Sequence, residues 1–259
     1  MKNPAISVVC PTYNSAEFII PTIRSVFSQT VSPQEIIISD DGSSDHTIDI
    51  VTQMIRSAPC ELRILQNPHK GPGAARNAGI RAAQGEWVAF LDSDDRWGNT
   101  KVQRVIEEIR TYPEVNFFCH DQLHQFLDGH QEPLNLAKRY QGMIPAKQLF
   151  RNCPFAMSAV TCRRDLLVTH GMFHEGLMSG QDFELWLRLI PHLRVHFIDE
   201  ILGWYIDRRG NISSKKRLRH LYNILWALTY NRHNTTLRWY FMGFVRHISI
   251  FCKNHILKI

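Results

Sequence analysis

Residues 6–14 read ISVVCPTYN, residues 35–45 read EIIISDDGSSD, and residues 87–95 read WVAFLDSDD. Each stretch starts as a short apolar run, which is typical of a buried strand, and ends in a polar loop. Helix-period segments separate these runs, so their order predicts βαβ units and a mostly parallel sheet. Ligands of such sheets bind beyond the carboxyl ends of the strands. We therefore expect the three polar loops to share one rim, suited to a nucleotide and a cation.

The rest of the chain is assigned in the same way, from apolar periodicity and from Gly and Pro breaks. The sequence predicts a further strand at 62–66 and helices at 16–28, 45–57 and 74–83. Beyond residue 100, the predicted helices are 101–110, 146–152, 181–189, 218–230 and 237–255, and the predicted strands are 115–120 and 157–161. Residues 121–141 are polar and broken by Gly and Pro, so they are expected to form a loop or a hairpin.

The composition is that of a globular protein, with 259 residues of which 44% are hydrophobic and 21% are charged. The longest uncharged run near the C-terminus, 221–231, is far shorter than the roughly 20 residues of a membrane-spanning helix, so no span is expected. The N-terminal residues lack the apolar segment of a secretory signal, so secretion is not expected. The six cysteines show no metal-site spacing and are expected to be free thiols.

Charge is distributed unevenly along the chain. The net charge is +6, yet residues 208–259 contain eleven Lys and Arg and no Asp or Glu. Such a tail is expected to meet phosphate, on lipid headgroups or on nucleic acid. Arg238, Arg246 and Lys253 share one face of the predicted helix 237–255, among aromatic and aliphatic residues typical of a helix in a membrane interface. The alternative is a helix that packs on its own domain with a solvated basic face. No nucleic-acid recognition motif accompanies the charge.

Asp92 and Asp94 stand two residues apart after the predicted strand 87–91. In an extended segment such positions point to the same side, where two carboxylates repel each other unless a cation lies between them. Hard oxygen ligands suit Mg²⁺ or Mn²⁺, and Mg²⁺ commonly binds one or two carboxylates together with substrate phosphates. The alternative is that Asp94 or Asp95 caps the helix that follows.

The motifs taken together resemble glycosyltransferase family 2, which has the GT-A fold. The resemblance rests on SVVCPTYNSAEFI (7–19), SVFSQT (25–30), EIIISDDGSSDHT (35–47), GPGAARNAGI (71–80), GEWVAFLDSDDRW (85–97) and GQDFELW (180–186). It implies a Rossmann-like, mostly parallel sheet flanked by helices, and inverting transfer of a sugar from a nucleotide diphosphate donor to an acceptor hydroxyl. It also implies a donor-binding half at 1–110 and an acceptor-binding, catalytic half at 111–214, with 215–259 as the basic helical tail.

The resemblance assigns the donor site residue by residue. Pro11 and Tyr13 match positions that flank the nucleobase, Tyr13 by stacking. Asp41 would accept a hydrogen bond from the base, which suits the N3–H of uracil, while Asp40 shapes the turn. Arg76 matches a nucleotide-contacting arginine; the alternative is an exposed helix residue.

The same resemblance assigns the acidic loop and the base. Asp92, Ser93 and Asp94 match the donor-binding DxD motif, with Asp94 as the more direct ligand of Mn²⁺ or Mg²⁺ and Asp92 on the ribose or the metal. Asp95 is expected to cap the next helix. Asp182 matches the catalytic base, which takes the proton of the acceptor hydroxyl.

Two positions depart from the pattern of the family. Gln181 stands where the family usually has Glu, and Ile206 and Arg208 stand where many members have Arg and His. Arg208 cannot bind a metal but could neutralise the diphosphate.

The expected protein is an inverting, metal-dependent glycosyltransferase that uses a UDP-sugar donor and acts on a glycan or lipid-linked acceptor in cell-envelope polysaccharide synthesis. It is expected to be cytoplasmic and peripheral on the inner face of the membrane, with no nucleic-acid partner. A non-catalytic nucleotide-sugar-binding subunit is the alternative.

Overall fold

The computed structural model describes residues 3–140, 153, 155–208, 217–234 and 237–255. The strands are β1 (Ile6–Thr12), β2 (Glu35–Asp40), β3 (Glu61–Gln66), β4 (Trp87–Phe90), β5 (Arg96–Trp97), β6 (Phe117–Gln125), β7 (Gln131–Pro133), β8 (Val160–Arg163) and β9 (Val195–Ile206). The helices are α1 (Ile19–Phe27), α2 (Thr47–Met54), α3 (Pro72–Ala82), α4 (Lys101–Thr111), α5 (Leu136–Tyr140), α7 (Arg164–Thr169), α8 (Gln181–Leu189), α10 (Arg217–Tyr230) and α11 (Leu237–His255).

All nine strands of the described residues belong to one mixed sheet, in the order β3-β2-β1-β4-β8-β6-β9-β5, with β7 paired to the end of β6. The pairs β1–β2, β2–β3, β1–β4 and β6–β9 are parallel, whereas β4–β8, β6–β8, β5–β9 and β6–β7 are antiparallel. Six of these nine strands therefore run in one direction, which confirms the predicted α/β class with a mostly parallel sheet.

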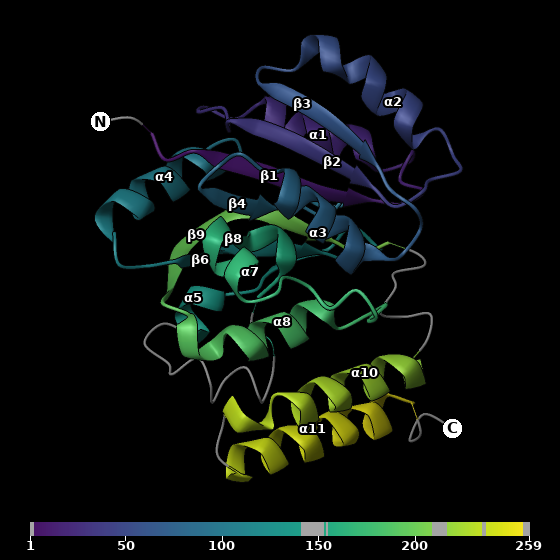
Figure 1. The fold of residues 1–259 in the computed structure, drawn as a ribbon, viewed down its shortest axis with the longest axis vertical. Helices are drawn as coiled ribbons and strands as arrows, with labels where there is room; N and C mark the ends of the chain where they lie inside the picture. Colours follow the sequence, from purple (N-terminus) through teal and green to yellow (C-terminus); the bar gives the residue numbers. More distant parts are fainter. Residues whose placement is uncertain (1–2, 141–152, 154, 209–216, 235–236, 256–259) are drawn as a thin grey trace.

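Helices cover both faces of the sheet (Figure 1). Successive side chains of a strand point to opposite faces, and β1 shows this directly: Val9 enters the buried cluster with α3, α7 and α8, whereas Val8 and Cys10 enter the cluster with α1, α2 and α4. A sheet that helices cover on both faces requires strands with apolar side chains on both sides.

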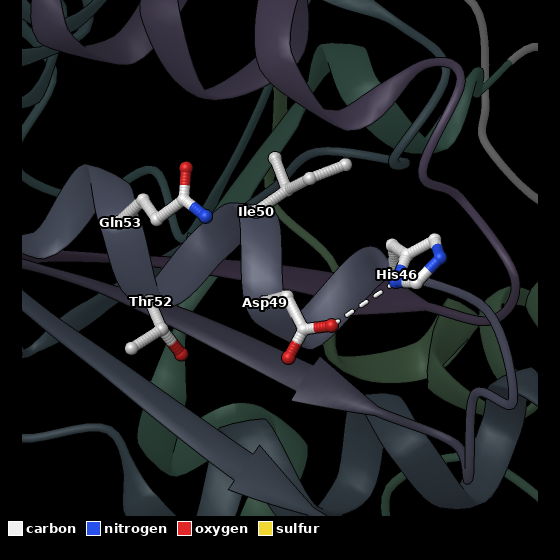
Figure 2. Close-up of a pocket in the computed structure, with 5 residues that line it drawn as sticks. All are labelled: His46, Asp49, Ile50, Thr52 and Gln53. Carbon is white, nitrogen blue, oxygen red and sulfur yellow. Dashed lines mark hydrogen bonds and ion pairs between the residues drawn. The ribbon is translucent and has the colours of Figure 1, made fainter.

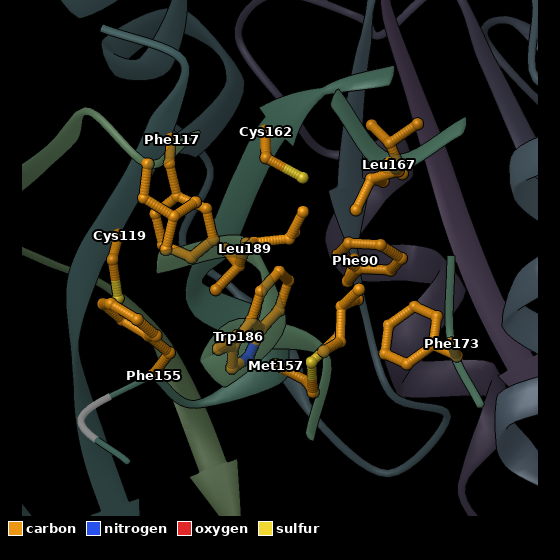
Figure 3. Close-up of a cluster of buried hydrophobic side chains, with 14 of the residues drawn as sticks. Phe90, Phe117, Cys119, Phe155, Met157, Cys162, Leu167, Phe173, Trp186 and Leu189 are labelled. Atoms are coloured by element: carbon orange, nitrogen blue, oxygen red, sulfur yellow. The ribbon is translucent and has the colours of Figure 1, made fainter. Parts of the chain in front are cut away.

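Trp186 of α8 is fully buried against the sheet (Figure 3). Its ring meets Phe117 of β6 edge-on at a centroid distance of 5.0 Å, and Phe155 and Phe173 lie at 6.2 and 6.3 Å. Such edge-to-face contacts stabilise aromatic clusters beyond the burial of their area. This cluster fixes α8, and therefore the residues at the start of α8, relative to the sheet.

Helix α10 packs against α8, and α11 packs against α10 (Figure 1). Ile224, Ala227 and Leu228 of α10 belong to the same buried cluster as α8. Helix α11 reaches this cluster through Tyr240, and its His247 ring lies 5.6 Å from the ring of Phe183. The inner faces of both helices thus pack on their own domain. Across the part of the chain that the structure describes, no helix combines the length and apolarity needed to cross a bilayer.

Most predicted elements are confirmed to within a few residues. In 121–141 a hairpin forms from β6 and β7, but helix α5 follows it and was not predicted, and neither were β5 and α7. The predicted strand at 157–161 is displaced, because β8 begins at Val160. Strand β9 was not predicted, because its middle carries the exposed residues Asp199 and Glu200 and so does not read as an apolar run. The predicted helix at 146–152 lies outside the described residues.

Candidate active site

The strand order reverses between β1 and β4. The chain builds outward from β1 through β2 to β3, and then returns through α3 to place β4 on the other side of β1. The loops after two such neighbouring strands leave a crevice at their carboxyl ends, which is where open α/β sheets bind ligands. The loop after β1 starts at Tyr13, and the loop after β4 contains the acidic residues 92–95. The predicted rim therefore coincides with this switch point.

An arginine meets each carboxylate of the Asp92–Asp94 pair. Arg76 of α3 donates from Nη2 to Oδ1 of Asp92 at 2.6 Å, and the Arg208 side chain, just after β9, forms an ion pair with Asp94. Arg76 is only 5% exposed, so the alternative of an exposed helix residue is wrong. Segments far apart in sequence are thus brought to one acidic loop.

Burial raises the pKa of Asp94, the nearby Asp92 carboxylate raises it further, and Arg208 opposes both effects. Two carboxylates in one partly buried place repel each other, and here this disfavours the charged form of Asp94. A cation between them would relieve this repulsion. The acidic loop therefore favours a positive charge beside it, from an arginine side chain or from a metal ion.

Ser93 and Asp95 tie the acidic loop to its surroundings. The Ser93 hydroxyl lies 2.8 Å from the Ser15 hydroxyl, which joins the loops after β4 and β1. The carboxylate of Asp95 accepts hydrogen bonds from the Ser158 hydroxyl and, at 3.0 Å, from the Ile206 amide. The prediction that Asp95 caps the next helix is wrong, because its carboxylate is buried in these contacts and α4 begins only at residue 101. Asp95 instead fastens the end of β9 to the acidic loop.

Asp41, at the end of β2, is buried and bonded to the loop after β3. Its carboxylate accepts hydrogen bonds from the backbone amides of Lys70 at 2.8 Å and Gly71 at 2.9 Å, and lies 2.8 Å from Nδ1 of His69. The Gly71 amide also lies 3.1 Å from the other carboxylate oxygen, so each oxygen of Asp41 has two contacts with this loop. Asp40 shapes the turn as predicted, since the Ser43 amide donates to it at 2.8 Å.

Tyr13 is 45% exposed beyond β1, and its ring stacks on His69 at a centroid distance of 4.3 Å. Pro11 is buried within β1, where it pairs with Ser39 of β2. His69 was not among the predicted site residues. Since β3 is parallel to β2, the loop after β3 must reach the same rim, and that topology was the signal that could have found it. Ser15 and Ser158, which hold the loops together, had no signal in the sequence.

Asp182 lies in the first turn of α8 and is half-buried. The adjacent Gln181 is 7% exposed and packs toward α3: a Cβ on Gly73 would lie 3.6 Å from Cγ of Gln181. The start of α8 therefore lies in contact distance of the helix that carries Arg76. Burial raises the pKa of the Cys153 thiol, and the Asp182 carboxylate adds to this, so the two groups are close. A carboxylate at a helix N-terminus is favoured by the helix dipole.

No cluster of three or more His, Cys, Asp or Glu side chains able to hold a metal by themselves occurs among the residues that the structure describes. Asp92 and Asp94 still fit Mg²⁺ or Mn²⁺, because such ions commonly bind one or two carboxylates and complete their coordination with substrate phosphates and water. The raised pKa of Asp94 is the observation that supports this fit.

A separate hollow lies on the outer surface of α2, lined by His46, Asp49, Ile50, Thr52 and Gln53 (Figure 2). All five residues come from α2 and the residue before it. His46 and Asp49 are largely exposed and pair with each other at 3.1 Å. The chemistry-bearing residues converge at the rim instead, so we do not assign the active site to this hollow.

The topology and the acidic pair at the switch point define the GT-A class of glycosyltransferase domain. The chain belongs to glycosyl transferase family 2, whose family model matches residues 7–167.

Two relatives align with most of this chain. The putative teichuronic acid biosynthesis glycosyltransferase TuaG of Bacillus subtilis is 38% identical, over 82% of this chain and 83% of its own length. The Escherichia coli UDP-Glc:alpha-D-GlcNAc-diphosphoundecaprenol beta-1,3-glucosyltransferase WfgD is 27% identical, over 98% and 96%. Other curated relatives, uncharacterised glycosyltransferases from Nostoc and Rickettsia, are much longer, and the chain spans 27–40% of their length.

Two solved structures show the same fold. S. aureus TarS 1-349 in complex with UDP-GlcNAc superposes with a TM-score of 0.74 at 22% identity, over 96% of this chain and 74% of that chain. The mannosyltransferase PcManGT from Pyrobaculum calidifontis, in complex with GDP-Man and Mn²⁺, superposes with a TM-score of 0.70 at 16% identity, over 97% and 70%. At these identities the likeness concerns the fold alone.

Proposed function

We propose that this protein is an inverting glycosyltransferase that moves a sugar from a UDP-sugar to a hydroxyl of a lipid-linked or surface glycan. The observation that carries the proposal is the Asp92–Asp94 pair, held by two arginines at the switch point between β1 and β4. The names of WfgD and TuaG support the UDP donor and the envelope-glycan acceptor respectively.

In this proposal the nucleobase binds at the outer end of the rim. Tyr13 and Pro11 flank it, and a carboxylate oxygen of Asp41 accepts the uracil N3–H. His69, stacked on Tyr13 and bonded to Asp41, holds both in place. The exposed ring of Tyr13 is what a stacking platform requires, because one face must be open to the ligand.

The diphosphate is proposed to bind at the acidic loop. Asp92 and Asp94 would hold Mn²⁺ or Mg²⁺, which stabilises the charge of the leaving diphosphate when it is bound. Arg76 and Arg208 lie on the same carboxylates and can turn a guanidinium N–H toward phosphate oxygens. Ser93 fixes the shape of the loop through Ser15.

The reaction is a single displacement. Asp182 takes the proton of the acceptor hydroxyl as that oxygen forms a bond to the anomeric carbon. The bond from the anomeric carbon to the diphosphate breaks on the opposite side, UDP leaves with the electron pair, and the configuration inverts. Gln181, beside Asp182, is available to hydrogen-bond a sugar hydroxyl.

A thermal-shift screen of nucleotide sugars with and without Mn²⁺ tests the donor assignment. A UDP-sugar at about 100 times its Kd is expected to stabilise the folded protein by about 2.7 kcal/mol, because the ligand binds the folded state only. GDP-, dTDP- and CDP-sugars at equal concentration serve as controls. Tighter binding of a GDP- or dTDP-sugar than of every UDP-sugar would refute the donor assignment. Binding of a UDP-sugar without any transfer or hydrolysis would favour a non-catalytic subunit.

The outer faces of α10 and α11 are proposed to rest on an anionic membrane surface at the cytoplasmic side. These faces expose large apolar side chains, namely Leu218, Tyr222, Tyr230, Phe241, Met242, Val245 and Ile250. The chain from residue 208 onward is strongly basic. Apolar side chains among basic residues are the composition that binds a lipid interface, where each basic residue near the surface contributes about 1 kcal/mol.

Replacing Val245 and Arg246 together by Glu is expected to weaken binding to anionic vesicles by about tenfold or more, because the change removes one attractive charge and adds two repulsive ones. Co-sedimentation with vesicles of anionic and of neutral lipid measures this. The matched control replaces Ile55 and Arg56 by Glu: this pair is also exposed and adjacent, at the end of α2. Vesicle binding that is unaffected by the first pair, or equally weakened by the second, would contradict the proposal.

A further inference from the structure

Helix α8 begins at a turn that its own residues do not cap. Gly180, the N-cap residue, has a left-handed backbone with φ of +70°, and no side chain of its own segment bonds the first turn of the helix. The free N–H groups of a first helical turn ordinarily receive such a bond. Asp182 therefore projects from a turn whose geometry has to be fixed from elsewhere.

Helix α10 makes the contacts that hold this turn. Nδ2 of Asn223, which is 4% exposed, donates to the carbonyl of Ser179 at 3.0 Å and lies 3.1 Å from the Ser179 hydroxyl. The next residue, Ile224, closes over Gly180: a Cβ on Gly180 would lie 3.0 Å from Cδ1 of Ile224. One polar and one apolar contact thus clamp residues 179 and 180, directly before the proposed base.

One helical turn earlier, α10 places His220 near Asp182. Burial lowers the pKa of His220, and the Asp182 carboxylate opposes this only in part, so the imidazole is neutral at pH 7. Within the described residues, its buried Nδ1 has no hydrogen-bond partner. Two further titratable groups lie near His220 and Asp182. Cys153 is close to Asp182, and His247 of α11, beside Arg246, is close to His220. The start of α8 is therefore covered by α10 through Asn223, Ile224 and His220.

We infer that α10 is part of the catalytic apparatus, and that Asn223 is a positioning residue that holds the Ser179–Gly180 turn so that Asp182 faces the acceptor hydroxyl. This inference rests on the proposed role of Asp182. Loss of the Asn223 amide frees the turn, and a displacement of about 1 Å at a reacting group can lower the rate about a hundredfold.

The test compares two asparagines that make the same kind of contact from the C-terminal segment to α8. Asn223 bonds the start of α8, whereas Nδ2 of Asn234 donates to the Leu187 carbonyl at 3.0 Å, near the end of α8. Asn223→Ala and Asn223→Leu remove the amide, and Leu keeps the volume. Asn234→Ala is the matched control.

Both Asn223 variants are expected to lower kcat for UDP release by about tenfold to a hundredfold, with an unchanged Kd for UDP in the presence of Mn²⁺. UDP release is measured with the UDP-sugar that the donor screen selects, and with water as acceptor. Asn234→Ala should keep wild-type kcat even if its melting temperature falls as far as that of the Asn223 variants. Hydrogen exchange should rise at residues 179–184 in the Asn223 variants, and at residues 187–190 in Asn234→Ala.

Wild-type kcat in Asn223→Leu, or an equal loss of kcat in Asn234→Ala, would overturn the inference. Unchanged hydrogen exchange at residues 179–184 would also overturn it, and this measurement needs no activity. Failure of the proposed function is a different result: in that case the wild-type protein releases no UDP, or Asp182→Asn is as active as the wild type.

Discussion

Asp182→Asn is expected to lower the rate of transfer by about 10²–10⁴-fold, which is the usual contribution of a general base. Asn has nearly the same size as Asp, so the first turn of α8 should keep its shape. The base acts on the acceptor hydroxyl, whereas the donor binds at the rim beyond β1 and β4. The loss should therefore fall on kcat, with little change in the Kd for UDP.

Glu175→Gln is the control for this variant. Glu175 is a carboxylate in the segment before α8, and it accepts hydrogen bonds from Asn77 at 2.9 Å and Arg81 at 3.3 Å. It should keep near-wild-type turnover. Near-wild-type turnover in Asp182→Asn would instead place the base elsewhere, with Glu175 and Glu184 as the candidates. Glu184 is the weaker of these two, because it is fully buried and paired with Arg188 at 2.9 Å.

Asp94→Ala is expected to remove the part of donor affinity that depends on Mn²⁺, on the order of a hundredfold or about 2.7 kcal/mol. Titration calorimetry with UDP, in Mn²⁺ and in EDTA, separates this part. In EDTA the variant should bind UDP at least as well as the wild type, because Arg208 loses its ion pair with Asp94 and is free for the diphosphate.

The control for Asp94 is Asp165→Ala, since Asp165 is also an aspartate paired with an arginine, Arg163, at 2.6 Å but lies at the surface on α7. It should bind UDP as the wild type does under both conditions. If Asp94→Ala keeps the full Mn²⁺-dependent gain in UDP affinity, the metal is held by other residues and the proposed role of Asp94 is wrong.

The prediction of the fold from sequence succeeded where the signal is local. The apolar runs at 6–10, 35–39 and 87–91 are buried strands, because a strand covered on both faces must be apolar on both. It failed for β9, where Asp199 and Glu200 are exposed at a break in the register between two stretches that pair with β6. Pairing with a neighbouring strand stabilises such a segment, and pairing is not visible in its own residues.

For the candidate site, too, the features that depend on local sequence were predicted, and the contacts between distant residues were not. The rim was predictable, because the carboxyl ends of parallel strands meet at one edge and the polar loops follow those strands. The partners at the rim were not predictable. Asp95 looked like a helix cap, since aspartate before a helix usually is one, yet its carboxylate is used to bond Ser158 and Ile206.

The sequence by itself therefore determined most of the strands and helices, which loops lie at the binding rim, and which residue types are available there. These follow from periodicities of two and 3.6 residues, which act over a few positions. Only the tertiary structure decided that Arg76 and Arg208 pair with Asp92 and Asp94, and that Asn223 of α10 holds the turn before Asp182. Such contacts join residues far apart in the chain, and they depend on how buried faces pack together, which no local pattern encodes.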